Sequence, residues 1–484
     1  MPSPSTARFT KIVATLGPAW SAPERMHALL DAGVNVVRVN ASHGTPAVRE
    51  QWITDLQRVL AGRREAAAIL LDLQGPRIRV GDLAEPVTLT PGAKVAFAPE
   101  GAARPGDIPT TYDDLAHDVQ AGTVILLDDG LLSVEVTGVK GDRVEAVVRY
   151  GGQLKSHKGM NLPGVEVSAP SLTDKDREDI AMAVRLGVDY VALSFVRRPD
   201  DIEELKGLLP RTIKTIAKIE KDTALKNLRQ IVDAADAIMV ARGDLGVELP
   251  FEEVPLVQKR IIREANLAGK PVITATQMLE SMIHAPRPTR AEASDVANAI
   301  LDGTDAVMLS AETAVGDFPL EAVQAMDRIA RELETHRTGR SPAFDLAVGR
   351  RGNADAASGK PRAPMRQEDA IGVATVAAAE LLGAPLVVCF TVSGFTARKV
   401  AAYRPGEPIF ALTTEGSTCR QLALVWGVVS GLAEHLPNYD QMLAVARQQI
   451  LDRGLAGPGA KVVVTAGVPF DVPGTTNLLK IESV

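Results

Sequence analysis

The chain has 484 residues, enough for about three globular domains, and its 46% hydrophobic and 23% charged content excludes a disordered protein or a coiled coil. The formal net charge of −7 argues against nucleic acid or an anionic membrane as the main partner. Cys389 and Cys419 are too few for a disulfide framework and favour a reducing compartment, so we expect a cytoplasmic protein. The sequence shows no apolar run long enough to span a membrane and no signal-peptide pattern.

Short runs rich in Val, Ile and Ala recur along the chain, and each is followed by polar residues and then by a helical pattern. Most are continuously apolar, which is typical of parallel strands covered on both faces. The eight runs are Thr10–Leu16, Val34–Asn40, Ala67–Asp72, Tyr190–Phe195, Thr212–Ile219, Ala237–Ala241, Pro271–Thr276 and Ala306–Ser310. They predict an α/β protein built on a (β/α)8 TIM barrel, whose catalytic groups lie at the carboxyl ends of the strands.

The barrel sequence is interrupted between its third and fourth units. Residues 76–165 change to short strands separated by glycine turns, at Ala93–Ala98, Thr123–Leu127, Leu131–Thr137 and Arg143–Arg149. This texture predicts a small β-barrel or sandwich domain inserted at the catalytic rim, where it would act as a lid. The catalytic barrel is therefore expected to be discontinuous, with segments 1–75 and 166–335.

A helix is expected at Ala322–Glu334, after which residues 336–366 lose periodicity. This stretch contains four Gly, three Pro and six Arg, which indicates a linker or a mobile loop. Residues 367–484 alternate strands and helices and predict a C-terminal α/β regulatory domain with an open sheet. Its expected strands are Leu386–Thr391, Ile409–Thr413, Val428–Leu432, Lys461–Thr465 and Leu478–Ile481.

The second expected barrel strand ends in polar side chains. Arg38, Asn40 and Ser42 are spaced at period two and so share one face. A guanidinium, an amide and a hydroxyl together suit a phosphate oxygen or a hydrated cation. A structural salt bridge of Arg38 is the alternative.

The fifth strand ends in Lys218 and Glu220, and Asp244 follows the sixth. Burying these charges inside a barrel is costly without a purpose. Two carboxylates with few other protein ligands fit Mg²⁺ or Mn²⁺, whose shell is completed by water and substrate oxygens. A ring of ion pairs that also includes Arg242 is the alternative. Gly243 fits a close approach of backbone to a ligand, or only a turn.

Hydroxyl and carboxyl groups are also expected where the last two barrel strands end. Thr276 closes the seventh strand, and Ser310 and Glu312 close the eighth. These groups can bind a carboxylate or relay a proton, or they can simply cap helices. Thr289 and Glu292 have capping-box spacing, and the nearby Arg287 and Arg290 would either cross a subunit interface or face solvent.

Taken together, these segments resemble the pyruvate kinase family, and they follow its order across all three expected domains. The matching segments are Thr10–Pro18, Val37–Gly44, Leu71–Arg79, Gly159–Gly164, Lys218–Glu220, Met239–Glu248, Thr274–Met282 and Pro288–Gly316. The resemblance implies transfer of the phosphoryl group of phosphoenolpyruvate to ADP, giving pyruvate and ATP, which is the last step of glycolysis.

The resemblance also implies roles for single residues. Arg38 would bind the transferring phosphate, and Lys218 would neutralise charge on that group and on the enolate. Glu220 and Asp244 would bind the divalent metal. The surroundings of the substrate carboxylate would be Gly243, Asp244 and Thr276, and Thr276 would help to deliver a proton to the enolate. Nucleotide phosphates would meet Arg79 and Lys158, with His43 nearby.

The third strand departs from the K⁺-requiring branch of the family. Asn40, Ser42 and Asp72 match three of the cation's ligands, but Leu73 offers no hydroxyl. A glutamate of that branch is replaced by Arg77. The resemblance therefore implies that Arg77 substitutes for K⁺ and that K⁺ is not required.

In the C-terminal domain, the loop with Thr391, Ser393, Gly394 and Thr396 resembles the family's effector-phosphate loop, and 474–477 resembles a neighbouring loop. Helix amides at such a loop can bind phosphate, although a capped helix with an empty loop is the alternative. The effector would be a sugar phosphate or AMP. The family also implies a homotetramer.

Two other functions would fit part of this set of residues. A metal-dependent lyase or aldolase acting on pyruvate enolate would use Glu220, Asp244 and an arginine in the same way, but it would have no need for Arg79, Lys158 and the lid. A regulatory binding protein without turnover is disfavoured because it would have no reason to keep buried charges together.

Overall fold

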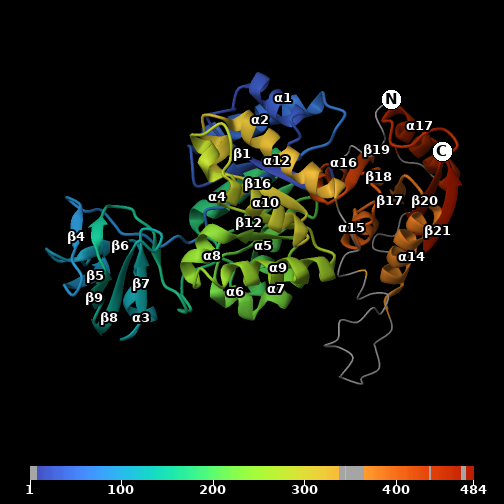
Figure 1. Cartoon of the computed structure of the whole chain (residues 1–484). Helices are drawn as coiled ribbons and strands as arrows, with labels where there is room; N and C mark the ends of the chain where they lie inside the picture. Colours follow the sequence, from blue (N-terminus) through green and yellow to red (C-terminus); the bar gives the residue numbers. More distant parts are fainter. Residues whose placement is uncertain (1–7, 337–343, 345–364, 435–437, 470–475) are drawn as a thin grey trace.

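The computed structural model describes residues 8–336, 344, 365–434, 438–469 and 476–484. Figure 1 shows a central body of strands and helices, a β-rich body on one side and a third body near the C-terminus on the other. The stretch 336–366, expected to be a linker or mobile loop, lies almost entirely outside the described residues. Among the described residues, no helix combines the length and apolarity needed to cross a membrane.

The central body is a closed barrel of eight parallel strands in the order β1-β16-β15-β14-β13-β12-β3-β2. The strands are β1 (Lys11–Leu16), β2 (Val36–Asn40), β3 (Ala68–Asp72), β12 (Tyr190–Leu193), β13 (Lys214–Ile219), β14 (Ala237–Ala241), β15 (Val272–Ala275) and β16 (Ala306–Leu309). All eight expected strands are present, so the predicted TIM barrel is confirmed. All of these strands except β14 are shorter than expected, and both Thr276 and Ser310 lie just past a strand rather than closing it.

Helices connect and cover these strands, as Figure 1 shows. They are α1 (Pro23–Asp31), α2 (Pro46–Ala61), α4 (Asp174–Leu186), α5 (Pro199–Leu208), α6 (Asp222–Lys226), α7 (Leu228–Ala234), α8 (Arg242–Glu248), α9 (Val254–Ala268), the 3-10 helix η2 (Glu280–Ile283), α10 (Arg290–Leu301), α11 (Ala311–Ala314) and α12 (Pro319–Thr335). The predicted capping box is present at the start of α10, where Thr289 and Glu292 bond each other's backbone amides.

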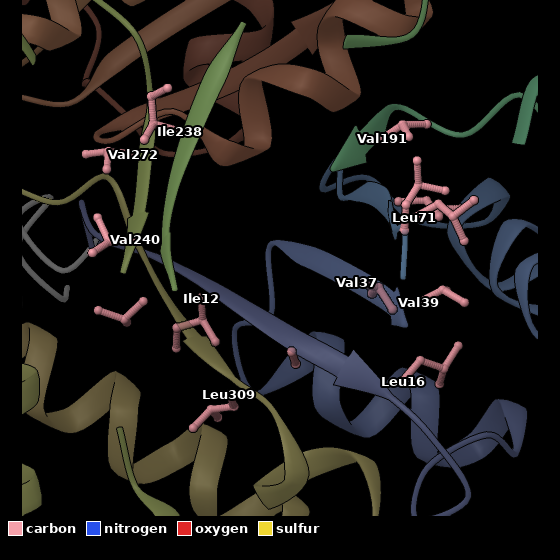
Figure 2. Close-up of a cluster of buried hydrophobic side chains, with 14 of the residues drawn as sticks. Ile12, Leu16, Val37, Val39, Leu71, Val191, Ile238, Val240, Val272 and Leu309 are labelled. Carbon is pink, nitrogen blue, oxygen red and sulfur yellow. The ribbon is translucent and has the colours of Figure 1, made fainter. Parts of the chain in front are cut away.

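Alternation along the strands decides which side chains reach the barrel interior. Val37 and Val39 of β2 point outward into the core between strands and helices, with Leu71, Val191 and other side chains shown in Figure 2. Their neighbours Val36 and Arg38 therefore point inward, and Val36 joins the separate core inside the barrel. The same alternation directs polar side chains into the barrel where they stand at the last inward-facing position of a strand.

The floor of the barrel is closed by the C-terminal domain. Leu424, from the 3-10 helix η4 (Leu422–Leu424), is fully buried in the core cluster inside the barrel. The Tyr190 hydroxyl donates a 2.8 Å hydrogen bond to the carbonyl of Gln421, just before that helix. The two domains are joined further by Arg404, whose guanidinium forms an ion pair of 2.9 Å with Asp305 at the start of β16.

The insertion contains β4 (Val87–Leu89), β5 (Lys94–Pro99), β6 (Ile108–Thr110), α3 (Leu115–Asp118), β7 (Val124–Leu127), β8 (Leu132–Lys140), β9 (Arg143–Tyr150), β10 (Gly152–Leu154) and β11 (Met160–Asn161). Its described strands form a six-stranded sheet, β11-β7-β8-β9-β5-β6, and the pair β10-β4. The sheet is open, whereas a closed barrel was one of the two expected forms. Its edge strands β11 and β6 are only two and three residues long and do not pair with each other.

The C-terminal domain is an open sheet in the order β19-β18-β17-β20-β21, as expected, and only β21 is antiparallel to its neighbour. Its elements besides η4 are α14 (Gln367–Leu382), β17 (Val387–Phe390), α15 (Phe395–Ala402), β18 (Ile409–Thr413), α16 (Gly416–Gln421), β19 (Val428–Leu432), α17 (Tyr439–Asp452), β20 (Lys461–Ala466) and β21 (Leu478–Ser483). Cys389 and Cys419 are both free and buried.

Candidate active site at the carboxyl ends of the barrel strands

Buried polar side chains gather at one end of the barrel, in contrast to the apolar interior beneath them. They come from the carboxyl ends of five strands or from the residues that follow them. These residues are Thr15, Arg38, Asp72, Ser194, Lys218 and Glu220, each at most 9% exposed. Their convergence at the strand ends matches the place where barrel enzymes carry their catalytic groups.

Asp72 connects the two cationic residues that sequence analysis assigned to phosphate. Its Oδ2 accepts a 2.7 Å hydrogen bond from Arg38 Nε, and its Oδ1 lies 3.2 Å from Lys218 Nζ. Strand β2 pairs with β3 so that Asn40 lies opposite Asp72, which brings Arg38 within reach of this carboxylate. Burial by itself would raise the pKa of Asp72, but the charges of Lys218 and Arg38 hold it below its ordinary value. The carboxylate thus stays ionised and fixes both cations.

Lys218 is held on several sides. Its Nζ lies 2.9 Å from Glu220 Oε1 and donates a 2.7 Å hydrogen bond to Ser194 Oγ. Burial would lower the pKa of Lys218, but Asp72 and Glu220 outweigh it and raise the pKa to about 12. Lys218 is therefore a permanently charged ammonium group at neutral pH.

Glu220 and Asp244 approach each other at the mouth of the barrel. Burial, and then the negative charge of Asp244, raise the pKa of Glu220 against the opposing effect of Lys218. The second Glu220 oxygen accepts a 2.7 Å hydrogen bond from the Phe195 amide. Asp244 lies in the first turn of α8, partly exposed, and lines a small crevice beside Arg77 and Asn161. Two carboxylates that repel each other at a solvent-accessible mouth fit a divalent cation.

The alternative ring of ion pairs that includes Arg242 is not formed. Arg242 begins helix α8 directly after β14, so its side chain turns away from the barrel axis. Its guanidinium reaches Asp295 on α10 at 2.7 Å and donates to the Thr276 carbonyl at 2.7 Å. Arg242 therefore supports the loop that carries Thr276, while Lys218 and Glu220 pair without it.

Thr276 is placed against Gly243 by an unusual backbone. Thr276 and Gln277 have φ values of 67° and 54°, in the left-handed region that non-glycine residues rarely adopt. The Thr276 Oγ1 accepts a 2.7 Å hydrogen bond from the Gly243 amide. Such backbone strain persists where the surroundings impose it, often at functional sites. The hydroxyl of Thr276 is thereby fixed next to the first turn of α8, which contains Asp244.

The residues expected at the monovalent-cation position lie around the end of β2. The Asn40 side-chain oxygen accepts a 3.0 Å hydrogen bond from the Ser42 amide, and Leu73 is buried. Asp72 is already engaged by Arg38 and Lys218. Gly75 has a φ of 69°, and a Cβ there would lie 3.0 Å from the Ser194 side chain, so the tight turn toward Arg77 requires glycine.

The nucleotide-side residues expected from sequence lie where the insertion leaves the barrel. Arg79 and Gly159 form an isolated β-bridge between the two segments that connect the insertion to the barrel, which brings Lys158 close to Arg79. Burial and the charge of Arg77 lower the pKa of Arg79. Burial, followed by the charges of Arg38, Arg77 and Arg79, lowers the pKa of His43. His43 is therefore neutral at pH 7, and the rim around it is strongly cationic.

Two acidic residues of the insertion face these cations. Asp128 Oδ1 lies 2.7 Å from Lys158 Nζ, and Asp129 Oδ1 lies 3.8 Å from Arg77. Both aspartates have positive φ, at 53° and 54°, in the turn between β7 and β8. Sequence analysis missed them, together with Ser194 and Thr15. The Asp-Asp-Gly run was the available signal for the turn, but nothing in it indicated which cations it would meet.

The remaining expected groups have structural contacts. Ser310 donates its amide to Glu312 at 2.7 Å, and Glu312 also accepts from the Leu279 amide, so Glu312 ties two loops together rather than ending a strand. Burial raises its pKa. Arg287 and Arg290 are exposed.

The expected effector loop lies at the start of α15. Gly394 caps this helix with a φ of 76°, Thr391 and Thr396 are buried, and Arg398 donates to the Ser393 carbonyl at 3.1 Å. Thr396 Oγ1 lies 2.9 Å from Thr476 Oγ1, which joins this loop to the neighbouring one. Residues 474 and 475 of that neighbouring loop lie outside the described residues.

Comparisons with known proteins give a consistent result over the chain. Residues 7–323 match the family model for the pyruvate kinase barrel domain, and 369–482 match the model for the pyruvate kinase alpha/beta domain. A pyruvate kinase of Geobacillus stearothermophilus is 45% identical over 99% of this chain and 80% of its own length. One from Agrobacterium vitis is 43% identical over 99% of this chain and 97% of its own. The crystal structure of a pyruvate kinase from Cryptosporidium parvum superimposes with a TM-score of 0.91 at 34% identity, covering 100% of this chain and 97% of the other.

Proposed function

The chain belongs to the pyruvate kinase family, and from that premise we propose how its own residues carry out the reaction. It is a phosphotransferase that moves the phosphoryl group of phosphoenolpyruvate to ADP, giving pyruvate and ATP. The bond from phosphorus to the enol oxygen breaks, a bond to a terminal ADP oxygen forms, and the enolate left behind takes up a proton. The alternative of a lyase or aldolase has no support among these relatives.

The observation that carries the proposal is the buried cluster of Arg38, Asp72 and Lys218. Arg38 presents a planar fork for phosphate oxygens, while its Nε remains on Asp72 at 2.7 Å. Lys218 supplies a positive charge fixed by Asp72 and Glu220 before substrate arrives. Charge stabilisation by groups that are already oriented is the main way in which a protein assists phosphoryl transfer. We therefore assign phosphate binding to Arg38 and neutralisation of the enolate to Lys218.

Glu220 and Asp244 fit a divalent metal, which the family requires, and we propose Mg²⁺ or Mn²⁺. The raised pKa of Glu220 reflects burial and an uncompensated neighbouring carboxylate, which a cation would relieve. Among the described residues, no group of three or more His, Cys, Asp or Glu side chains forms a complete ligand set. This fits an ion whose remaining ligands are substrate oxygens and water. When bound, the ion would act as a Lewis acid on those oxygens.

Thr276 and the first turn of α8 are proposed to meet the carboxylate end of the substrate. Gly243 and Asp244 lie in this turn, and the Thr276 hydroxyl is 2.7 Å from the Gly243 amide. A hydroxyl held there by strained backbone can orient the carboxylate and assist, through water, the proton delivery to the enolate. Arg79, Lys158 and His43 are proposed to line the nucleotide side.

The finer points are proposals that rest on the resemblance. Arg77 is proposed to replace K⁺ near Asn40, Ser42 and Asp72. We also propose a homotetramer, a cytoplasmic location and the domain limits 76–165 and 367–484. An effector phosphate, such as a sugar phosphate or AMP, is proposed to bind at Thr391, Ser393, Gly394 and Thr396. Two buried free cysteines fit a reducing compartment.

The experiment is an incubation of the protein with phosphoenolpyruvate, ADP and Mg²⁺, followed by measurement of ATP and pyruvate. Both products should appear in equal amounts. Failure to form them would reject the proposed reaction, and cleavage of an oxo-acid without ADP would instead favour the lyase.

A further inference from the structure

A second cleft lies between the floor of the barrel and the C-terminal domain. Its volume is about 740 Å³. The barrel side is formed by the end of α2 and the segment that leads into β3, and the other side by α16, β19 and the end of α17. Ala67, just before β3, lines this cleft, whereas Asp72 ends that strand, roughly 17 Å away at the rise of a β-strand. The cleft is therefore separate from the candidate active site.

Basic groups outnumber acidic ones in the lining of this cleft. It contains Arg63, Arg64, Arg420 and Arg453, against Glu65 and Asp452. Arg63 and Arg420 are anchored by ion pairs of 2.7 Å with Asp31 and 2.8 Å with Asp189. Arg64 is exposed and has no ion pair or hydrogen bond among the described contacts. The ion pairs neutralise Arg63 and Arg420, so the positive charge that the cleft can offer a ligand is that of Arg64 and Arg453.

The unpartnered guanidinium of Arg453 is the strongest indication that the cleft binds a ligand. Its side chain is only 10% exposed, yet its Nε and Nη1 atoms are buried without a hydrogen-bond partner. Glu65 Oε2 lies 3.5 Å from Nη1, too far for a good hydrogen bond, and Glu65 is itself 63% exposed. The guanidinium packs 5.7 Å from the centre of the Phe410 ring, which limits how it can turn.

A second buried group in the cleft also lacks a partner. Gln449 donates its Nε2 to the Leu432 carbonyl at 2.9 Å, which fixes the amide and leaves Oε1 buried without a donor. Unpaired buried polar groups cost free energy, so two of them in one cleft call for a ligand that supplies the missing contacts. The ligand would carry an anionic acceptor for Arg453 and a donor, such as a hydroxyl, for Gln449.

We propose that this cleft binds the phosphate group of a small organic phosphate bearing hydroxyl groups. Several arginines around one cavity suit a phosphate, because guanidinium forks match its oxygens and the charge of about two is shared among them. The volume fits a metabolite rather than a polymer. The site lies outside the proposed catalytic residues and apart from the loop at Thr391–Thr396, so it goes beyond the proposed function.

The test uses the full chain carrying Lys218→Met, which weakens phosphate binding at the proposed active site. Ribose 5-phosphate, inorganic phosphate and acetate are titrated by calorimetry into this protein and into versions that also carry Arg64→Ala or Arg453→Met. Arg58→Ala is the matched control, because Arg58 is an exposed arginine on α2 that does not line the cleft. Arg453→Met should abolish one class of ribose 5-phosphate sites, and Arg64→Ala should weaken it about tenfold, while Arg58→Ala leaves it unchanged.

Inorganic phosphate should compete for this class of sites and acetate should not. Coincident isotherms for the Arg64 variant and the Arg58 control would overturn the proposal, as would equal binding of acetate or no binding of ribose 5-phosphate at millimolar concentration. If Arg453→Met does not fold, as judged by circular dichroism, Arg64→Ala decides the result alone. Failure here leaves ATP formation by the unmodified chain unaffected, so the two proposals are tested separately.

Discussion

Lys158 Nζ lies 2.7 Å from Asp128 Oδ1, which means that a cation proposed to meet nucleotide phosphate is paired with an acidic residue of the same inserted domain. Asp129 faces Arg77 in a similar way from the adjacent position. The two aspartates form a tight turn that holds negative charge where phosphate oxygens are expected. An arriving nucleotide would have to displace this turn or share the cations with it.

Asp128→Asn should therefore lower the KM for ADP by a few-fold with little change in kcat, because the competing charge is removed from Lys158. The effect is small because Lys158 is 38% exposed and solvent screens the pair. Steady-state kinetics with ADP as the varied substrate checks this. Asp82→Asn is the control, since Asp82 pairs with the exposed His157 in the same domain. An increased KM would show that Asp128 positions Lys158 instead of competing for it.

Lys218→Met should reduce kcat by at least about a hundredfold, because one oriented charge in a catalytic site is typically worth two to three orders of magnitude. Binding of Mn²⁺ should be retained, since Glu220 and Asp244 remain, and electron paramagnetic resonance can measure it. Lys214→Met removes a lysine from the other end of the same strand and should have no effect on kcat.

The loss of Lys218 also leaves Asp72 and Glu220 buried with less positive charge nearby, so a thermal melt must accompany the kinetics. Ser194→Ala gives a milder test, because Ser194 Oγ accepts a hydrogen bond from Lys218 without carrying charge. It should lower kcat less than Lys218→Met does. Near-normal turnover in both variants would remove Lys218 from the mechanism.

Addition of K⁺ should change the rate less than twofold when Na⁺ or tetramethylammonium keeps the ionic strength constant. We propose this because Arg77 would provide a fixed positive charge at the expected cation position, where Leu73 offers no hydroxyl. Arg77→Ala should slow the reaction, with partial recovery in K⁺. Arg104→Ala, which removes an arginine elsewhere in the insertion, is the control. Strong activation of the unmodified protein by K⁺ would refute this role of Arg77.

Lys11 should make the stability of the protein depend on pH. Burial lowers the pKa of Lys11 from 10.5 to about 7, even though Nζ donates a 2.7 Å hydrogen bond to the Val428 carbonyl. The unfolded chain binds more protons than the folded chain between these values, so stability rises as pH increases from 7 toward 10.5. The slope for this residue is at most about 1.4 kcal/mol per pH unit.

Lys11→Met should remove that slope and bring the thermal midpoints at pH 7 and pH 9 closer together than in the unmodified chain. Lys461→Met, at an exposed lysine on β20, should leave the slope unchanged. Equal slopes in all three proteins would mean that Lys11 stays protonated in the folded state.

The barrel could be predicted from sequence because its strands are buried on both faces and therefore appear as continuous apolar runs. The inward direction of Arg38 and Lys218 also followed, since period-two alternation depends only on local backbone geometry. The ion pairs could not be predicted from the sequence, because they depend on strand register and on how each chain segment turns after its strand. Asp72 was predicted to lie near a monovalent cation, and only the structure shows that it also contacts Arg38 and Lys218.

Arg242 is a second residue whose ion-pair partner could not be predicted from the sequence. It follows a barrel strand just as Glu220 does, but it starts a helix, and its side chain is directed toward Asp295 instead of the barrel axis. The strained backbone at Thr276 and the turn at Asp128 also depend on tertiary surroundings. Residue types and strand positions thus indicated the chemistry, while the network of contacts required the structure.

Leu424 fills the bottom of the barrel from a different domain, and this has a consequence for how the chain can be divided. A barrel expressed alone, even with all its proposed catalytic residues, would expose the apolar interior that Leu424 covers and would lose the ion pair of Asp305 with Arg404. The C-terminal domain therefore completes the hydrophobic core of the barrel in addition to being joined to it. Exchange of this domain between relatives should succeed only when the residue that takes the place of Leu424 fits the apolar interior of the recipient barrel.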